Sequence, residues 1–195
     1  MAKRQITRAD LMPMAEYSGQ RREQRRRVIE IKRARRLEVG PFATFYFECY
    51  ETMWHQVHEM LFVERGGEDQ IDGELATYNP LVPKGDELVA TFMLEIDEPV
   101  RRAQTLSKLG GIEETVTMTF AGMVIPGWAE TDAERTRADG KASSVHFTHF
   151  PFTCAQIVKF REPGTRVVVG FEHPGYRHLA IMPDTMKAVL AQDFD

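Results

Sequence analysis

The fold class of this 195-residue chain is decided by the run Glu87-Leu88-Val89-Ala90-Thr91-Phe92-Met93-Leu94-Glu95-Ile96. Every second residue of the run is apolar, beginning at Leu88 and ending at Ile96. Side chains alternate between the two faces of a β-strand, so this period of two predicts a strand with one face in the core. A sheet is therefore expected at the centre of the protein.

Further strands are expected on both sides of this run. An aromatic-rich segment precedes it, and β-branched or aromatic residues dominate the later segments, which is typical of half-buried strands. A glycine, Gly122, separates two of these segments and predicts a hairpin between them. The predicted strand segments are Phe42–Cys49, Thr115–Ala121, Met123–Glu130, Ser144–Phe152 and Val167–Phe171.

Helices are expected between and around these strands, and residues 131–141 are polar and charged, which predicts a loop. The predicted helices are Met14–Arg36, Tyr50–Leu61, Asp69–Thr77, Pro99–Leu109 and Pro183–Phe194. Strands and helices do not alternate one for one. The sequence therefore predicts an α+β fold, with a mixed or antiparallel sheet of five to seven strands, packed helices and a long basic N-terminal helix.

Charge is distributed very unevenly along the chain. Residues 1–36 carry 12 Lys or Arg and 4 Asp or Glu, whereas the rest of the chain carries 13 and 25. We therefore expect two parts, a basic helical arm over residues 1–36 and a single α+β domain over residues 37–195. The arm can dock on its own acidic body, on a second copy in a homodimer, or on an anionic partner.

The arginines of the predicted helix are the candidate contacts to an anionic partner. They are Arg22, Arg25, Arg26, Arg33 and Arg36. Nucleic-acid binding needs little more than such a cationic surface. However, the helix carries no interleaved aromatic residues and no known reader motif follows it. The pattern therefore favours a docking arm over a nucleic-acid reader.

The sequence also bears on compartment and on common enzyme classes. No apolar run approaches the about 20 residues that span a bilayer, and the N-terminus lacks the apolar stretch of a secretory signal. The cytoplasm is expected, where the two cysteines, Cys49 and Cys154, stay reduced. Cys49 is either a redox thiol or, more commonly, a small buried hydrophobe. No zinc-type cysteine spacing, P-loop, dinucleotide fingerprint or nucleophile elbow occurs.

The histidines supply the candidate ligands for a transition metal. His55 and His58 lie three apart on a predicted helix, and Glu51 lies one turn before His55, so the three could share one ion. His146 and His149 lie on opposite faces of a predicted strand, which makes them poor joint ligands. A second candidate set combines His146 with the pair that flanks a turn, His173 and His178. Either set would make the chain a His-dependent metal-binding oxidoreductase or hydrolase.

Several segments together resemble one bacterial family, the domain of unknown function family 3501 (DUF3501). The segments span nearly the whole chain, and the most specific is Tyr78-Asn79-Pro80-Leu81-Val82-Pro83. The others are Ile6–Leu11, Arg35-Arg36, Gln56–Leu61 with Glu64-Arg65, Glu74–Thr77, Ala90–Glu95, Ser144–Phe147 and His173–Tyr176.

The resemblance implies no established activity. It implies an association with rubrerythrin-like proteins and iron–sulfur oxidoreductases, and hence a role beside redox or peroxide metabolism. In the family pattern, the places of His55, His58 and His149 are commonly other residues, which argues against a shared helix metal site. The positions that it favours are His146, His173, Glu59, Glu64, Asn79 and Tyr176.

Three functions follow, in this order of preference. The first is a non-catalytic accessory or interaction protein that serves a redox system. The second is the metal-binding enzyme, and the third is nucleic-acid binding through the arginine-rich helix.

Overall fold

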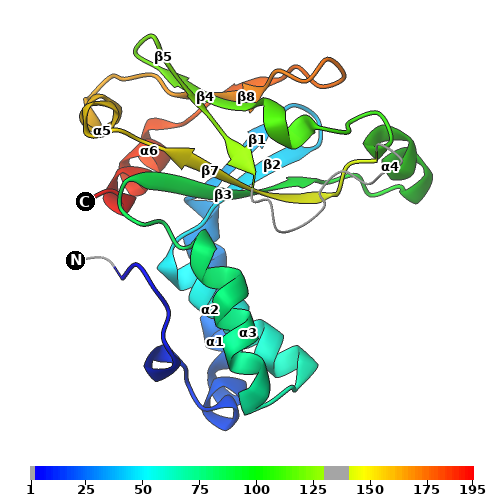
Figure 1. Ribbon diagram of the computed structural model, residues 1–195, viewed down its shortest axis with the longest axis vertical. Helices are drawn as coiled ribbons and strands as arrows, with labels where there is room; N and C mark the ends of the chain where they lie inside the picture. The colour runs from blue at the N-terminus through cyan, green and yellow to red at the C-terminus, as the bar shows by residue number, and fades with distance from the viewer. Residues whose placement is uncertain (1–2, 130–140) are drawn as a thin grey trace.

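The computed structural model describes residues 3–129 and 141–195, so the predicted loop over residues 131–141 lies almost wholly outside the described residues. Two antiparallel sheets stack on one another, and a stalk of helices extends from the outer face of one of them (Figure 1). The predicted α+β class is confirmed. No described helix is long and apolar enough to cross a membrane.

The larger sheet contains the run that decides the fold. Its strand order is β1-β2-β3-β7-β6, and every neighbouring pair is antiparallel. The strand β3 lies at its centre, where Phe92 pairs with Phe45 on one side and with His146 on the other. The strands are β1 (Arg36–Val39), β2 (Ala43–Phe47), β3 (Glu87–Leu94), β6 (Trp128–Ala129) and β7 (Val145–Pro151).

The remaining strands form a second sheet, with the order β5-β4-β8-β9. The predicted hairpin around Gly122 joins two of them. The expected strands are therefore present but are divided between two sheets, because the pattern of a strand does not reveal its partner. The strands are β4 (Val116–Phe120), β5 (Met123–Pro126), β8 (Val168–Phe171) and β9 (Leu179–Ile181).

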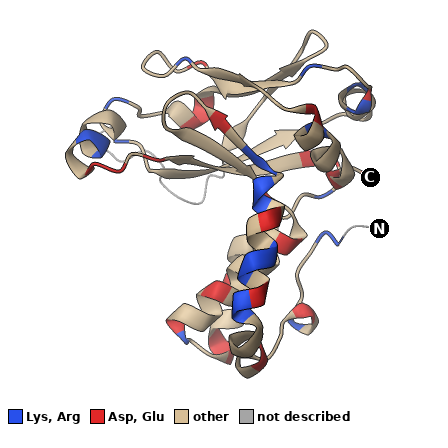
Figure 2. Ribbon diagram, turned by 180° about the vertical axis from the view of Figure 1, so that it is seen from behind, with Lys and Arg blue, Asp and Glu red and all other residues tan. Residues whose placement is uncertain are grey.

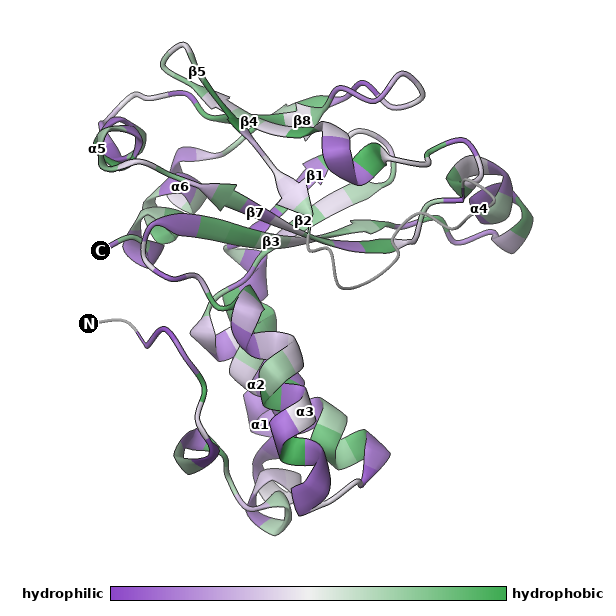
Figure 3. Cartoon of the chain, in the orientation of Figure 1, coloured by the Kyte–Doolittle hydropathy of each residue, from purple (hydrophilic) through white to green (hydrophobic). Residues whose placement is uncertain are grey.

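Aromatic side chains fill the space between the sheets. The Phe45 ring lies 5.4 Å from that of Phe92 and 5.2 Å from that of Phe171, which belongs to the other sheet. Hydrophobic residues are accordingly concentrated along β3 and β7 (Figure 3). Helices close the edges of this core: α4 (Pro99–Leu106), α5 (Cys154–Arg161), α6 (Asp184–Leu190) and the 3-10 helices η3 (Ile112–Thr115) and η4 (Ala191–Asp193).

The stalk has a smaller apolar core of its own. It consists of α1 (Met14–Arg33), α2 (Tyr50–Glu64), α3 (Glu68–Tyr78) and the 3-10 helices η1 (Arg8–Asp10) and η2 (Asn79–Leu81). Ile6 of the N-terminal segment, Val57 of α2 and Val89 of β3 meet in this core. The predicted boundary at residue 36 therefore falls where the stalk meets the sheet, and helices from both sides of it pack together.

The basic helix is shorter than expected. It ends at Arg33, and Arg36 begins β1. The reason is tertiary: the carbonyl oxygen of Arg35 accepts a hydrogen bond from the Phe47 amide at 2.9 Å, so this segment pairs with the end of β2 instead of continuing the helix.

Candidate functional site

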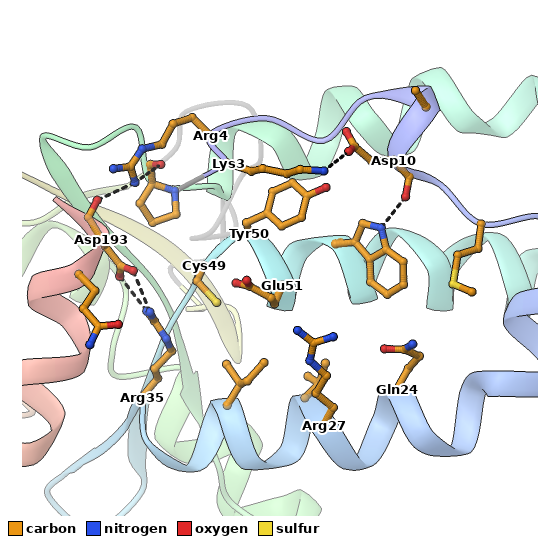
Figure 4. Close-up of a pocket in the computed structure, with 17 residues that line it drawn as sticks. Lys3, Arg4, Asp10, Gln24, Arg27, Arg35, Cys49, Tyr50, Glu51 and Asp193 are labelled. Atoms are coloured by element: carbon orange, nitrogen blue, oxygen red, sulfur yellow. Dashed lines mark hydrogen bonds and ion pairs between the residues drawn. The ribbon is translucent and has the colours of Figure 1, made fainter. Parts of the chain in front are cut away.

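A cavity of about 830 Å³ lies between the N-terminal segment, α1, the start of α2 and the end of the chain (Figure 4). Charged and aromatic side chains dominate its walls. The charged and aromatic members are Lys3, Arg4, Asp10, Arg27, Arg35, Tyr50, Glu51, Trp54 and Asp193, and Gln24, Gln192, Cys49 and several apolar residues complete the lining.

Most charges on these walls are neutralised within the protein. The Arg35 guanidinium makes two parallel contacts with the Asp193 carboxylate, at 2.7 and 2.8 Å. Arg4 donates to the Asp193 carbonyl oxygen at 2.6 Å and pairs with Asp195. Lys3 pairs with Asp10, whose pKa this contact lowers well below its usual range. These contacts tie both chain ends to the base of the stalk.

Two charges in the cavity differ from the others. Arg27 of α1 and Glu51 of α2 line it from opposite helices, with the Glu51 carboxylate on the side of Cys49 (Figure 4). Within residues 3–129 and 141–195 neither forms an ion pair within 4 Å. The Glu51 carboxylate also interacts with the Cys49 thiol, and this contact contributes to the raised pKa of the thiol.

The environment of Cys49 favours the protonated thiol over the thiolate. Cys49 is the N-cap of α2, where its sulfur accepts the Thr52 amide. A helix N-terminus ordinarily favours a thiolate. Here burial outweighs that effect and the nearby Arg35 charge, and it raises the pKa of the Cys49 thiol to about 11. Of the two interpretations of Cys49, the buried hydrophobe fits this environment.

His58 holds the N-terminal segment against α2. Its Nε2 accepts the Met12 amide at 3.0 Å, and its Nδ1 lies 2.7 Å from the Trp54 carbonyl oxygen. Burial lowers the pKa of His58, so the ring is neutral with its proton on Nδ1. Both ring nitrogens of His58 are therefore engaged in hydrogen bonds to the backbone, and neither faces a metal site. The other members of this predicted ligand set lie apart from it: Glu51 faces the cavity, and His55 contacts the Tyr17 hydroxyl at 3.0 Å.

Glu59 connects α2 to α1. Its carboxylate accepts the Tyr17 hydroxyl at 2.7 Å and two Arg21 nitrogens at 2.8 Å each. The Arg21 hydrogen bonds lower the pKa of Glu59 from 4.5 to about 2. Burial and this carboxylate together raise the pKa of Tyr17. Part of the basic helix thus docks on an acidic residue of its own chain.

The second predicted ligand set is not assembled. His146 stacks on Phe92 inside the sandwich, at 4.5 Å between ring centres. His173 is held in a turn, where Nε2 lies 3.2 Å from the Gly110 carbonyl oxygen and Nδ1 accepts the Gly175 amide. His178 packs on the ring of Tyr176. Across the part of the chain that the structure describes, no group of three His, Cys, Asp or Glu side chains is arranged to hold a metal.

The other positions that the family resemblance favours also make structural contacts within the chain. Asn79 pairs with the backbone of Ile6, accepting its amide at 2.7 Å and donating to its carbonyl at 2.9 Å. Glu64 accepts a hydrogen bond from Gln70.

Tyr176 fixes the turn between β1 and β2. Its hydroxyl donates to the Val39 carbonyl at 2.7 Å and accepts the Ala43 amide at 3.1 Å. Gly40 in that turn has a φ of 72°, and a Cβ there would lie 2.6 Å from the same hydroxyl, so glycine is required.

A second surface lies on the outer side of the stalk, where Figure 2 shows Lys and Arg along α1. We call it the arginine face. It is a depression of about 840 Å³ lined by Ser18, Arg21, Arg22, Arg25, Arg26, Ile29 and Phe62. Arg22, Arg25 and Arg26 are exposed, and no ion pair is formed by them within the described residues. Arg33 and Arg36, by contrast, pair with Glu30 and Glu38.

The arginine face also contains apolar surface, which the sequence analysis missed. Ile29 is 55% exposed, and the Phe62 ring lies 4.6 Å below the Arg21 guanidinium. No signal in the sequence could reveal this combination, because Ile29 belongs to α1 and Phe62 to α2. Only the packing of the two helices brings them together.

Comparison with known proteins supports the family resemblance. One similar solved structure is a crystal structure of a novel protein of unknown function from Burkholderia pseudomallei K96243. It is 34% identical, its TM-score is 0.90, and the match covers 97% of this chain and 99% of that chain. No curated protein matches. The family described as "Protein of unknown function (DUF3501)" matches residues 5–194. The chain therefore belongs to the DUF3501 family.

Proposed function

We propose that this chain is a non-catalytic interaction protein that binds an acidic protein partner through the arginine face. The observation that carries the proposal is that Arg22, Arg25 and Arg26 stand exposed, with no carboxylate partner in the described chain. The neighbouring Arg21 is paired with Glu59, so it helps to hold α1 against α2 and is not available to a partner protein. An unpaired group of like charges on a rigid helix is suited to steering and orienting an oppositely charged surface.

The apolar part of the arginine face favours a protein over a nucleic acid. Ile29 and Phe62 offer contacts that a phosphate backbone cannot use, whereas protein interfaces are enriched in arginine and aromatic residues around an apolar centre. Nucleic-acid binding remains the competing outcome of the test, since the same arginines would contact phosphates.

The redox context enters the proposal through the family resemblance alone. It makes a rubrerythrin-like protein or an iron–sulfur oxidoreductase the first partners to test. The unpaired thiols of Cys49 and Cys154 are consistent with a reducing, cytoplasmic setting. A homodimer is a further part of the proposal. Because α1 packs on α2 of its own chain, the dimer would form either by exchange of α1 or through another surface.

The test is binding of the purified chain to a rubrerythrin-like protein and to an iron–sulfur oxidoreductase, measured by biolayer interferometry. We expect saturable binding that weakens as salt increases. Labelled single- and double-stranded DNA at low salt serves as the competing ligand. Binding to DNA without binding to either protein would replace this proposal with the nucleic-acid alternative.

A further inference from the structure

We propose that a separate cavity, at the corner between the larger sheet and the stalk, binds an organic ammonium ion with an apolar body. The cavity measures about 490 Å³ and lies on the face of β2, β3 and β7 that points away from the sandwich. Ligand sites commonly measure about 300–1,000 Å³, so the space suits a small molecule. This inference is independent of the arginine face.

Apolar and aromatic groups form most of the walls. Met93, Val145 and Phe147 come from the outer face of the sheet, and Met53 and Leu81 come from α2 and η2. The remaining lining residues are polar or amphipathic: Lys32, Tyr46, Glu48, Gln56, Tyr78 and Thr91. A few convergent polar groups among apolar walls are typical of a binding site for a small molecule.

Glu48 is the group that selects the ligand. The residue is only 3% exposed, although it lines the cavity. One carboxylate oxygen accepts the Thr91 hydroxyl and the other accepts the Thr52 hydroxyl, both at 2.6 Å. Each oxygen therefore keeps accepting capacity.

No ion pair within the described chain reaches this carboxylate, and the nearby Arg35 guanidinium bonds to the Glu48 carbonyl oxygen instead, at 3.3 Å. Within residues 3–129 and 141–195, no Lys, Arg or His nitrogen lies within 4 Å of the Glu48 carboxylate oxygens. A buried carboxylate with hydroxyl donors alone is costly unless a cation balances it, and a bound ammonium would supply that charge.

The rings around the cavity favour the same class of ligand. Tyr46, Tyr78 and Phe147 all line it, and aromatic faces attract ammonium groups. Lys32 is the one cationic side chain among the described lining residues. Its flexible stem allows its ammonium group to move toward water, whereas two hydroxyls hold Glu48 in place. If the charge of Lys32 instead determined which ligands bind, an anion would bind better than a cation. The charge of the preferred ligand therefore distinguishes the two cases.

The test compares three probes of similar shape and different charge: 2-phenylethylamine, 2-phenylethanol and 3-phenylpropionate. Binding is measured by isothermal titration calorimetry at neutral pH. We expect the amine to bind roughly tenfold more tightly than the alcohol, and the acid to bind most weakly. Glu48→Gln keeps the shape of the side chain and removes its charge, so it should abolish the preference for the amine. Glu87→Gln, at the start of β3 and outside the cavity, should retain the preference for the amine.

The melting temperature of Glu48→Gln shows whether this variant folds. A second variant tests the cavity independently in case it does not. Val145→Trp fills the cavity from the start of β7, where Val145 is half-buried, and should abolish binding of all three probes. The proposal is overturned if the acid binds as well as the amine, if no probe binds at millimolar concentration, or if either cavity variant leaves the preference for the amine unchanged.

Discussion

Arg35 and Asp193 lie 158 positions apart in the sequence and form a buried salt bridge, in which Nη1 and Nη2 of the arginine each donate to one carboxylate oxygen. Their side chains are 8% and 9% exposed. Arg35 stands where the stalk meets β1, and Asp193 stands in the last turn of the chain. This one contact therefore fixes the C-terminus to the base of the stalk.

Removal of one partner should destabilise the protein strongly. Arg35→Met leaves the Asp193 carboxylate buried without a cation, and loss of one member of a buried pair costs about 3–5 kcal/mol. Asp193→Leu should behave similarly. The double variant should lose much less than the sum of the two single losses, because no uncompensated charge remains. Urea denaturation measures all three free energies of unfolding.

The exposed pair of Arg33 with Glu30 provides the control for this cycle. Arg33→Met should change stability little, since exposed pairs contribute little. Additive losses in the Arg35 and Asp193 double variant would contradict the account of the buried pair.

Glu59 should make the stability of the stalk depend on pH. The Arg21 hydrogen bonds lower its pKa from 4.5 to about 2 in the folded protein. A carboxylate with a lowered folded-state pKa stabilises the fold above its unfolded pKa and loses that effect as pH falls through the folded value. Glu59→Gln should therefore cost about 2 kcal/mol at neutral pH, the usual magnitude for hydrogen bonds to a charged group.

The difference between wild type and Glu59→Gln should shrink as pH falls from 4.5 to about 2. Chemical denaturation at a series of pH values measures it. Glu64→Gln is the matched control on the same helix, because among the described residues Glu64 accepts its hydrogen bond from the uncharged Gln70 side chain. A difference that stays constant across this pH range would show that Glu59 acts through packing and not through charge.

The sequence predicts the centre of the fold well and its tertiary organisation poorly. The alternation in Glu87–Ile96 predicts β3, and Gly122 predicts the hairpin of β4 and β5. The short strands β1 and β9 escape detection, because three or four residues carry too little periodicity, whereas the equally short β8 is revealed by its run of valines. The assignment of strands to two sheets depends on long-range packing that no local pattern contains.

The candidate site residues show the same limit. Helical spacing places His55 and His58 near one another, yet His58 is occupied by the Met12 amide, which only the folded N-terminal segment supplies. The exposed arginines of α1 are visible in the sequence, whereas Ile29 and Phe62 beside them are brought together by helix packing. Glu48 appears in the sequence as an ordinary strand-end residue, and its burial follows from contacts with α2 and β3.

Asn79 should control attachment of the N-terminal segment. Asn79→Ala removes both hydrogen bonds to the Ile6 backbone, which leaves a partly buried amide and carbonyl without partners. Trypsin should then cleave at Lys3, Arg4 and Arg8 faster than in the wild type. Thr77→Ala, in the preceding helix α3, where the hydroxyl donates to the Gly73 carbonyl, should leave the rate unchanged. Equal cleavage rates in Asn79→Ala and wild type would show that other contacts hold the segment.

The two thiols should differ sharply in reactivity. Burial raises the pKa of Cys49 to about 11, whereas Cys154 is exposed. Reaction with Ellman's reagent at pH 8 should show one fast thiol in the folded protein and two in denaturant. Cys154→Ser should remove the fast phase, and Cys49→Ser should preserve it. A fast phase that survives in Cys154→Ser would contradict the protonated, buried state of Cys49.

The central claim is that the arginine face binds an acidic protein partner. Its most direct test is the affinity of two triple variants for the purified rubrerythrin-like or iron–sulfur partner. The first variant carries Arg22→Glu, Arg25→Glu and Arg26→Glu. The control carries Arg101→Glu, Arg166→Glu and Arg177→Glu, which are exposed positions on the sandwich, so both variants have the same net charge.

Biolayer interferometry measures both dissociation constants at physiological salt. We predict that reversal of the arginine face weakens binding by roughly a hundredfold or more, since close interfacial charge pairs contribute at least about 1.5 kcal/mol each. The control should weaken binding by less than about threefold, because charges outside an interface act only through screened long-range attraction. Equal affinities for the two triple variants would contradict the claim.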